Sequence, residues 1–135
     1  MDTAAKILVI GGLVSLVYAF VMGFVLSQVR LKDHMIPQPR LLNVHVVALW
    51  EGFMLLGLVF GVVLSNLSSG VETAAALLLI AGGFFQLFAN TIAWTQKLED
   101  LFAPPHGAVY SMAVINAILH FAGLIILTFG AIKAL

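Results

Sequence analysis

The sequence contains no cysteine, and only 9% of its 135 residues are Asp, Glu, Lys or Arg. A typical soluble domain has about 25% charged residues. Without cysteine the chain can form neither a disulfide framework nor a zinc–thiolate site. Six basic residues, balanced by six acidic ones, cannot build the basic patch that holds nucleic acid electrostatically. A disordered chain is also excluded, because 62% of the residues are hydrophobic.

Four long stretches carry no charged residue, namely residues 7–29, 52–71, 73–96 and 101–132. A helix needs about 20 apolar residues to cross a bilayer, and each stretch is long enough. They are continuously apolar instead of alternating, which indicates helices and not the strands of a barrel. The first stretch is too long for the core of a signal peptide, and no convincing small-residue cleavage site follows it, so we interpret it as a helix.

The polar and proline-containing segments between these stretches are short. The sequence therefore predicts an all-α, up-down-up-down four-helix bundle in the membrane, with helices at about residues 5–30, 41–66, 71–97 and 106–133 in one domain, 1–135. Lys6 and Lys133 lie on the side of both termini, against four cations on the other side: Arg30, Lys32, Arg40 and Lys97. This imbalance favours a cytoplasmic position for the side opposite the termini. We expect an integral protein of a bacterial inner membrane.

Small residues indicate where helices approach closely. Gly57 and Gly61 form a small-xxx-small pair in the second helix, and we expect a close helix contact there. The pairs Gly11–Gly12 and Gly82–Gly83 predict similar contacts in the first and third helices.

Polar residues within the apolar segments are the candidates for function, because a central carboxylate costs about 2.5–3.5 kcal/mol to insert. They are His45, Glu51, Gln86, Asn90, Trp94, His106, Tyr110, Asn116 and His120. Most of them belong to the half of the bilayer away from the termini, as the parts of one site would. Structural alternatives remain: a protonated carboxyl at Glu51, interhelical hydrogen bonds at Gln86 and Asn90, and an aromatic belt at Trp94.

Helical spacing refines this set. Gln86, Asn90 and Trp94 follow an i, i+4, i+8 pattern and are predicted to share one face. His45 and Gly52 share a face of the second helix, where the missing side chain of Gly52 would leave room for a flat ring. Glu51 points about 120° away from His45. A site between protomers, or a large cofactor, would let both residues take part. His120 lies deeper than His45, which disfavours a haem held by both.

Two segments carry a family resemblance. Residues 45–52 read His-Val-Val-Ala-Leu-Trp-Glu-Gly, and residues 86–94 read Gln-Leu-Phe-Ala-Asn-Thr-Ile-Ala-Trp. They resemble the styrene oxide isomerase family of small four-helix membrane proteins. That family carries a His, five residues and then Asn-Gly, and later Asp-x-x-Ala-Asn-x-x-x-Tyr. The resemblance extends over roughly residues 12–130.

The resemblance implies a haem b whose iron is bound by His45, with Gly52 beside the cofactor. It also implies a homotrimer that holds the haem between protomers. The family reaction is a Meinwald rearrangement, in which ferric iron acts as a Lewis acid on an epoxide and an aldehyde forms. The expected partners are therefore a hydrophobic small-molecule substrate, the lipid bilayer and two further copies of the chain.

Three positions depart from the family pattern. Glu51 replaces the family Asn, Gln86 the Asp and Trp94 the Tyr, whereas His45 and Asn90 match. Because these are the groups expected to orient the substrate, the departures suggest retained haem with a changed substrate or reaction. Glu51, Gln86, Asn90 and Trp94 are the candidate catalytic residues, with Glu51 and Gln86 on opposite sides of the pocket.

Two other functions stay open. One is a non-enzymatic membrane protein that binds haem or a lipophilic molecule. The other is a metal-free acid–base isomerase of a lipid, in which Glu51 is the acid and His106 or Tyr110 is its partner.

Overall fold

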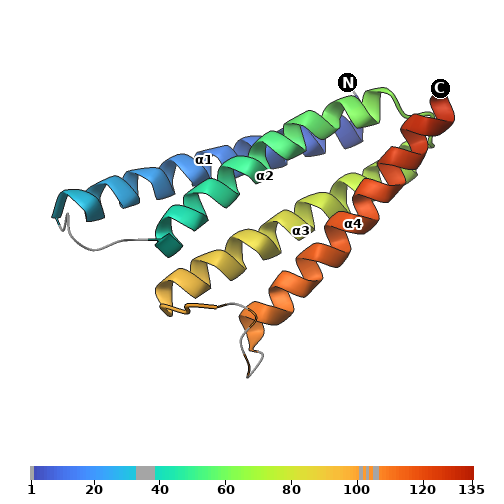
Figure 1. Cartoon of the computed structure of the whole chain (residues 1–135). Helices are drawn as coiled ribbons and strands as arrows, with labels where there is room; N and C mark the ends of the chain where they lie inside the picture. The colour runs from blue at the N-terminus through green and yellow to red at the C-terminus, as the bar shows by residue number, and fades with distance from the viewer. Residues whose placement is uncertain (1, 33–38, 101, 103, 105–106) are drawn as a thin grey trace.

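The computed structural model describes residues 2–32, 39–100, 102, 104 and 107–135. In these ranges it has four helices and no strand: α1 (Thr3–Lys32), α2 (Pro39–Val63), α3 (Ser69–Thr95) and α4 (Ala108–Ala134). Consecutive helices are antiparallel, and both ends of the chain lie at the same end of the molecule (Figure 1). The predicted all-α four-helix architecture is confirmed, and each helix end lies within three residues of its predicted position.

The helices form two hairpins, α1–α2 and α3–α4, each of which is extensively packed. α2 and α3 form the central pair, and α3 also contacts α1. α4 meets α2 only sparsely, and in the described part of the chain no Cα atom of α4 lies within 8 Å of one in α1. The seam between α2 and α4 is therefore the most weakly closed contact between neighbouring helices.

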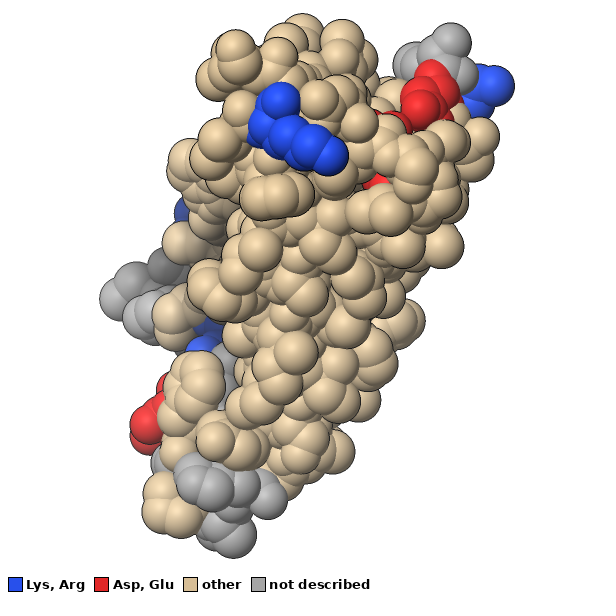
Figure 2. Space-filling model, turned by 90° about the vertical axis from the view of Figure 1, so that its right-hand side faces the viewer, with Lys and Arg blue, Asp and Glu red and all other residues tan. Residues whose placement is uncertain are grey.

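All four helices are long and apolar enough to cross a membrane. The shortest, with 25 residues, is roughly 37 Å long, against about 30 Å for the hydrocarbon core. Large apolar side chains cover the outer surface, including Phe20, Phe24, Phe60 and Phe129. Figure 2 shows charged groups near the two ends of the molecule and an uncharged band between them. The chain is an integral membrane protein whose apolar surface contacts the bilayer.

The helix ends follow from local sequence signals. α2 starts at Pro39, whose missing N–H is tolerated in the first turn of a helix. α3 ends in a Schellman motif, because the N–H of Leu98 donates to the carbonyl of Ala93 (2.9 Å) and the N–H of Lys97 donates to that of Trp94 (3.1 Å). Lys97 occupies the left-handed position of this motif, with φ at 55°.

Two of the glycine predictions are wrong. A Cβ atom added to Gly52 would lie 2.6 Å from Cγ of Leu16 and 3.0 Å from the carbonyl oxygen of Gly12, so α1 fills the space that was expected to be open. A Cβ atom added to Gly57 would meet nothing within 4 Å, and one on Gly61 would make only ordinary contact with Leu127. The close approach of α1 and α2 therefore occurs at Gly12 and Gly52.

Candidate functional site

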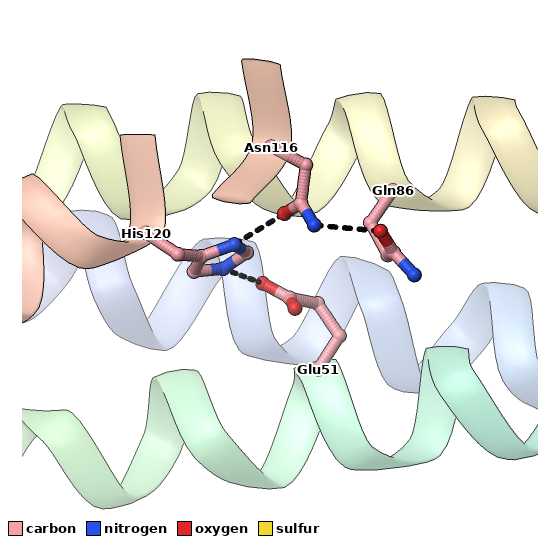
Figure 3. Close-up of polar contacts among 4 residues, drawn as sticks. All are labelled: Glu51, Gln86, Asn116 and His120. Carbon is pink, nitrogen blue, oxygen red and sulfur yellow. Dashed lines mark hydrogen bonds and ion pairs between the residues drawn. The ribbon is translucent and has the colours of Figure 1, made fainter. Parts of the chain in front are cut away.

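The carboxyl group of Glu51 lies inside the bundle, close to the middle of its helix. Glu51 is 6% exposed, and its Oε1 atom lies 3.2 Å from Nε2 of His120 on α4. Figure 3 shows the two side chains reaching toward each other from opposite helices. Because both lie near mid-helix, the structure holds a carboxyl–imidazole pair near the centre of the membrane.

Two amides orient this pair. Nδ2 of Asn116 donates to Oε1 of Gln86 at 2.6 Å, so Oδ1 of Asn116 faces Nδ1 of His120 and accepts its hydrogen bond (Figure 3). With Nδ1 as a donor, a neutral His120 has only a lone pair on Nε2. The hydrogen bond to Glu51 then requires one further proton, located on either Glu51 or His120. When these two atoms are hydrogen-bonded, one proton therefore lies between Nε2 and Oε1.

Adjacent glycines of α3 make room for this pair. A Cβ atom on Gly83 would lie 2.7 Å from Cδ of Glu51, and one on Gly82 would lie 2.9 Å from Nδ1 of His120. Larger side chains at these positions would displace the carboxyl group and the imidazole. The predicted close packing at Gly82–Gly83 therefore exists, and it accommodates the two polar groups.

A pocket of about 590 Å³ lies beside the pair. It is lined by Val47, Trp50, Glu51, Phe53, Met54, Gln86, Asn116 and His120. Its polar end consists of the hydrogen-bonded network, and its wall is apolar and aromatic. Trp50 and Phe53 are 72% and 59% exposed, so the pocket reaches the outer surface of the bundle. A hydrophobic molecule could enter it sideways from the lipid.

Asn90 and Trp94, the other two candidate residues on α3, do not line this pocket. Asn90 is buried, donates to the backbone carbonyl of Gln86 (2.9 Å) and accepts a hydrogen bond from Asn43 of α2 (2.6 Å). Trp94 packs against a cluster from α1 and α2 that includes Met22 and Leu41. Gln86, Asn90 and Trp94 all meet residues of α2, so they share one side of α3 as their spacing predicts, although only Gln86 lines the pocket.

His45 faces α1 and is absent from the pocket lining. Its Nδ1 atom hydrogen-bonds to the carbonyl oxygen of Ala19 at 2.8 Å, and its ring lies against Gly23. Nδ1 must be the donor in this bond, which leaves a lone pair on Nε2. No side-chain nitrogen or oxygen is both buried and unpaired in the described ranges, so Nε2 reaches the surface. One chain therefore presents His45 and Glu51 on different faces, as their spacing predicts.

The partner of Glu51 in the described residues is His120, which was not one of the two candidates named from the sequence. Tyr110 packs edge-to-face on Phe102, with ring centroids 6.0 Å apart, whereas His120 contacts Glu51. His106, like His34 in the first loop, lies outside the described residues. The i, i+4 spacing of Asn116 and His120 was the available signal, because two polar residues on one turn of an apolar helix suggest a shared polar contact.

Comparisons with protein-family models, curated proteins and solved structures find no match.

No group of three or more His, Cys, Asp or Glu side chains that could hold a metal ion gathers within the described ranges. A single-histidine ligand such as His45 would suit an iron that arrives with its own macrocycle. Histidines that bind metals usually donate their other N–H to a carbonyl or carboxylate, and the Ala19 carbonyl provides this contact. His45 is therefore the residue that would hold such an iron. Since α1 fills the space at Gly52, a macrocycle would have to lie outside the chain that ligates it.

Proposed function

We propose that the protein is a membrane-embedded isomerase that rearranges a hydrophobic epoxide or a related oxygenated substrate, with haem b ligated by His45. The single observation that carries this proposal is the hydrogen bonding of the His45 imidazole. Its Nδ1–H is held by the Ala19 carbonyl, and its Nε2 atom has no hydrogen bond and is not fully buried. This arrangement supports ligation of one iron by one histidine.

A ring of identical chains follows from the proposal. His45 and the Glu51 pocket lie on different faces, so a site that uses both requires one face from each of two copies. Contacts between unlike faces are heterologous, and they close into a cyclic oligomer when the rotation permits. A homotrimer in a bacterial inner membrane is the form that we propose, with the cofactor between neighbouring copies.

When bound, ferric haem would supply Lewis acidity toward the oxygen of the substrate. The chain's own residues perform the other tasks. The apolar wall with Trp50 and Phe53 excludes water and holds the hydrophobic part of the substrate. Glu51 lies where a carboxylate would stabilise developing positive charge or accept a proton. A proton accepted there would be shared with Nε2 of His120. Gln86 orients the network through Asn116.

Asn90 and Trp94 have indirect roles in this proposal. Asn90 connects α3 to α2 through Asn43, and Trp94 fills the α1–α2 side of the bundle. We therefore propose them as residues that position α2, which carries both His45 and Glu51.

The test is an absorption spectrum of the detergent-purified protein after haem reconstitution, for wild type, His45→Ala and the matched control His120→Ala. We expect a Soret band in the wild type and in the control, and its loss in His45→Ala. A colourless wild type, or a band that survives in His45→Ala, would overturn the assignment. Epoxide rearrangement is then assayed on the haem-loaded protein.

A second candidate is supported by the Glu51–His120 pair itself. A carboxyl and an imidazole that share one proton in an apolar pocket can deliver and remove protons without a metal, as an acid–base isomerase of a lipid requires. The same variants separate the two functions. Acid–base isomerisation would survive in His45→Ala and fall by about 10²–10⁴-fold in Glu51→Gln, whereas the haem function requires His45.

A further inference from the structure

The pocket beside Glu51 must remain neutral overall, and neither proposed reaction explains what keeps it neutral when the shared proton leaves. While the proton lies between Glu51 and His120, the pair is neutral overall. Loss of this proton leaves the Glu51 carboxylate beside the lone pair of Nε2. An isolated charge of this kind is strongly disfavoured in the interior of a membrane. The pocket can therefore release this proton readily only if another positive charge replaces it.

No other titratable group is found to neutralise Glu51 in the described part of the chain. α3 presents Gly83 and Gln86 to it, α4 presents His120, and the titratable Tyr18 of α1 instead hydrogen-bonds Thr91. The other buried carboxylate, Glu72, lies in the first turn of α3 and lines a separate pocket near the chain termini. His45 faces α1. The replacement charge must come from a ligand.

The pocket is suited to a cation that is itself lipophilic. Trp50, Phe53, Val47 and Met54 offer an apolar wall, and the indole of Trp50 can also attract a cation through its ring face. The second carboxyl oxygen of Glu51 has no hydrogen bond and is not among the buried unpaired atoms, so it is accessible from the pocket. A volume of about 590 Å³ admits a molecule of several rings.

We propose that this pocket binds a lipophilic organic cation in exchange for the proton shared by Glu51 and His120. One cation enters and one proton leaves, so the site remains neutral. Glu51 becomes the counter-ion of the cation, and His120 stays neutral with its Nδ1–H on Asn116. The exchange involves no haem, and it stands or falls separately from the proposed isomerase.

The experiment is isothermal titration of the detergent-purified full-length protein with tetraphenylphosphonium from about pH 6 to about pH 8. Where the pair carries its proton, linkage requires the affinity to rise by about tenfold per pH unit. Repeating the titration in buffers of different ionisation enthalpy gives the number of protons released, which we expect to be one per cation.

Two variants provide the comparison. Glu51→Gln should weaken binding by about 100-fold or more and remove its pH dependence. Glu72→Gln, which neutralises the other buried carboxylate, should leave both unchanged. Binding that is independent of pH, or that releases no proton in the wild type, would overturn the proposal even if Glu51→Gln failed to fold. Equal binding by wild type and a folded Glu51→Gln would also overturn it.

Discussion

At the scale of single residues, Gly82 and Gly83 determine where the titratable side chains can lie. Each gives the space of a missing Cβ atom to a polar group from another helix: His120 at Gly82 and Glu51 at Gly83. The pair would not meet in its present geometry if α3 carried larger residues there. The two glycines of α3 thus determine whether side chains of α2 and α4 can contact each other.

Gly83→Ala should therefore disturb the site, whereas Gly57→Ala should not. The methyl group introduced by Gly83→Ala would collide with the Glu51 carboxyl, and overpacking of this kind costs about 1–3 kcal/mol. Gly57 has open space around it, and alanine in a helix interior is favoured over glycine by about 0.5–1 kcal/mol. Unfolding midpoints of both purified variants measure the difference. Equal shifts in the two variants would contradict the role given to Gly83.

The family resemblance led us to expect Glu51 and Gln86 beside one pocket, which both of them line, but the sequence did not identify His120 as the partner of Glu51. A carboxylate in an apolar segment is conspicuous by composition alone. Its partner depends on the relative register of α2 and α4, which the periodicity of either helix does not contain. For the same reason, the open space expected at Gly52 was wrong, because only the packed structure reveals that α1 occupies it.

At the scale of the helices, apolar length and proline positions were enough to locate all four elements. The end of α3 has a feature that the sequence did not predict, because a lysine occupies the left-handed position that glycine usually takes. Nothing in the local composition distinguishes Lys97 from an ordinary loop cation. Its conformation follows from the hydrogen bonds that Leu98 and Lys97 donate to the last turn.

Lys97→Gly should stabilise the protein by about 1 kcal/mol, because a non-glycine residue in the left-handed region costs about 1–2 kcal/mol and the freer unfolded chain offsets part of the gain. The neighbouring exposed Glu99→Gly is the matched control and should give no gain. Thermal or denaturant unfolding of both variants in the same detergent provides the comparison. Destabilisation by Lys97→Gly would show that its positive charge at the helix end matters more than its backbone strain.

At the scale of the whole molecule, the antiparallel order of the helices places the loop between α2 and α3 and the loop between α3 and α4 on opposite sides of the membrane (Figure 1). The excess of cations on the side opposite the termini favours the cytoplasm for that side. This orientation is still a prediction, because the arrangement of the helices is the same in either direction.

A natural chain without cysteine makes the orientation simple to measure. Ser68 makes no side-chain capping hydrogen bond, so Ser68→Cys should be tolerated, and Glu99→Cys lies in the other exposed loop. In intact cells an impermeant maleimide should label Ser68→Cys, and it should label Glu99→Cys only after lysis. The reversed pattern would invert the orientation, and labelling of both from outside would contradict four crossings. The unmodified chain provides the unlabelled control.

The position of the pocket mouth also determines from which phase a ligand reaches the pocket. Because Trp50 and Phe53 bring the pocket to the flank of the bundle near mid-helix, a ligand arrives by diffusing within the acyl chains and not through the surrounding water. Its effective concentration is then a mole fraction in the membrane. Adding inert lipid at constant total ligand should dilute the ligand in two dimensions and lower occupancy, although the aqueous volume never changes.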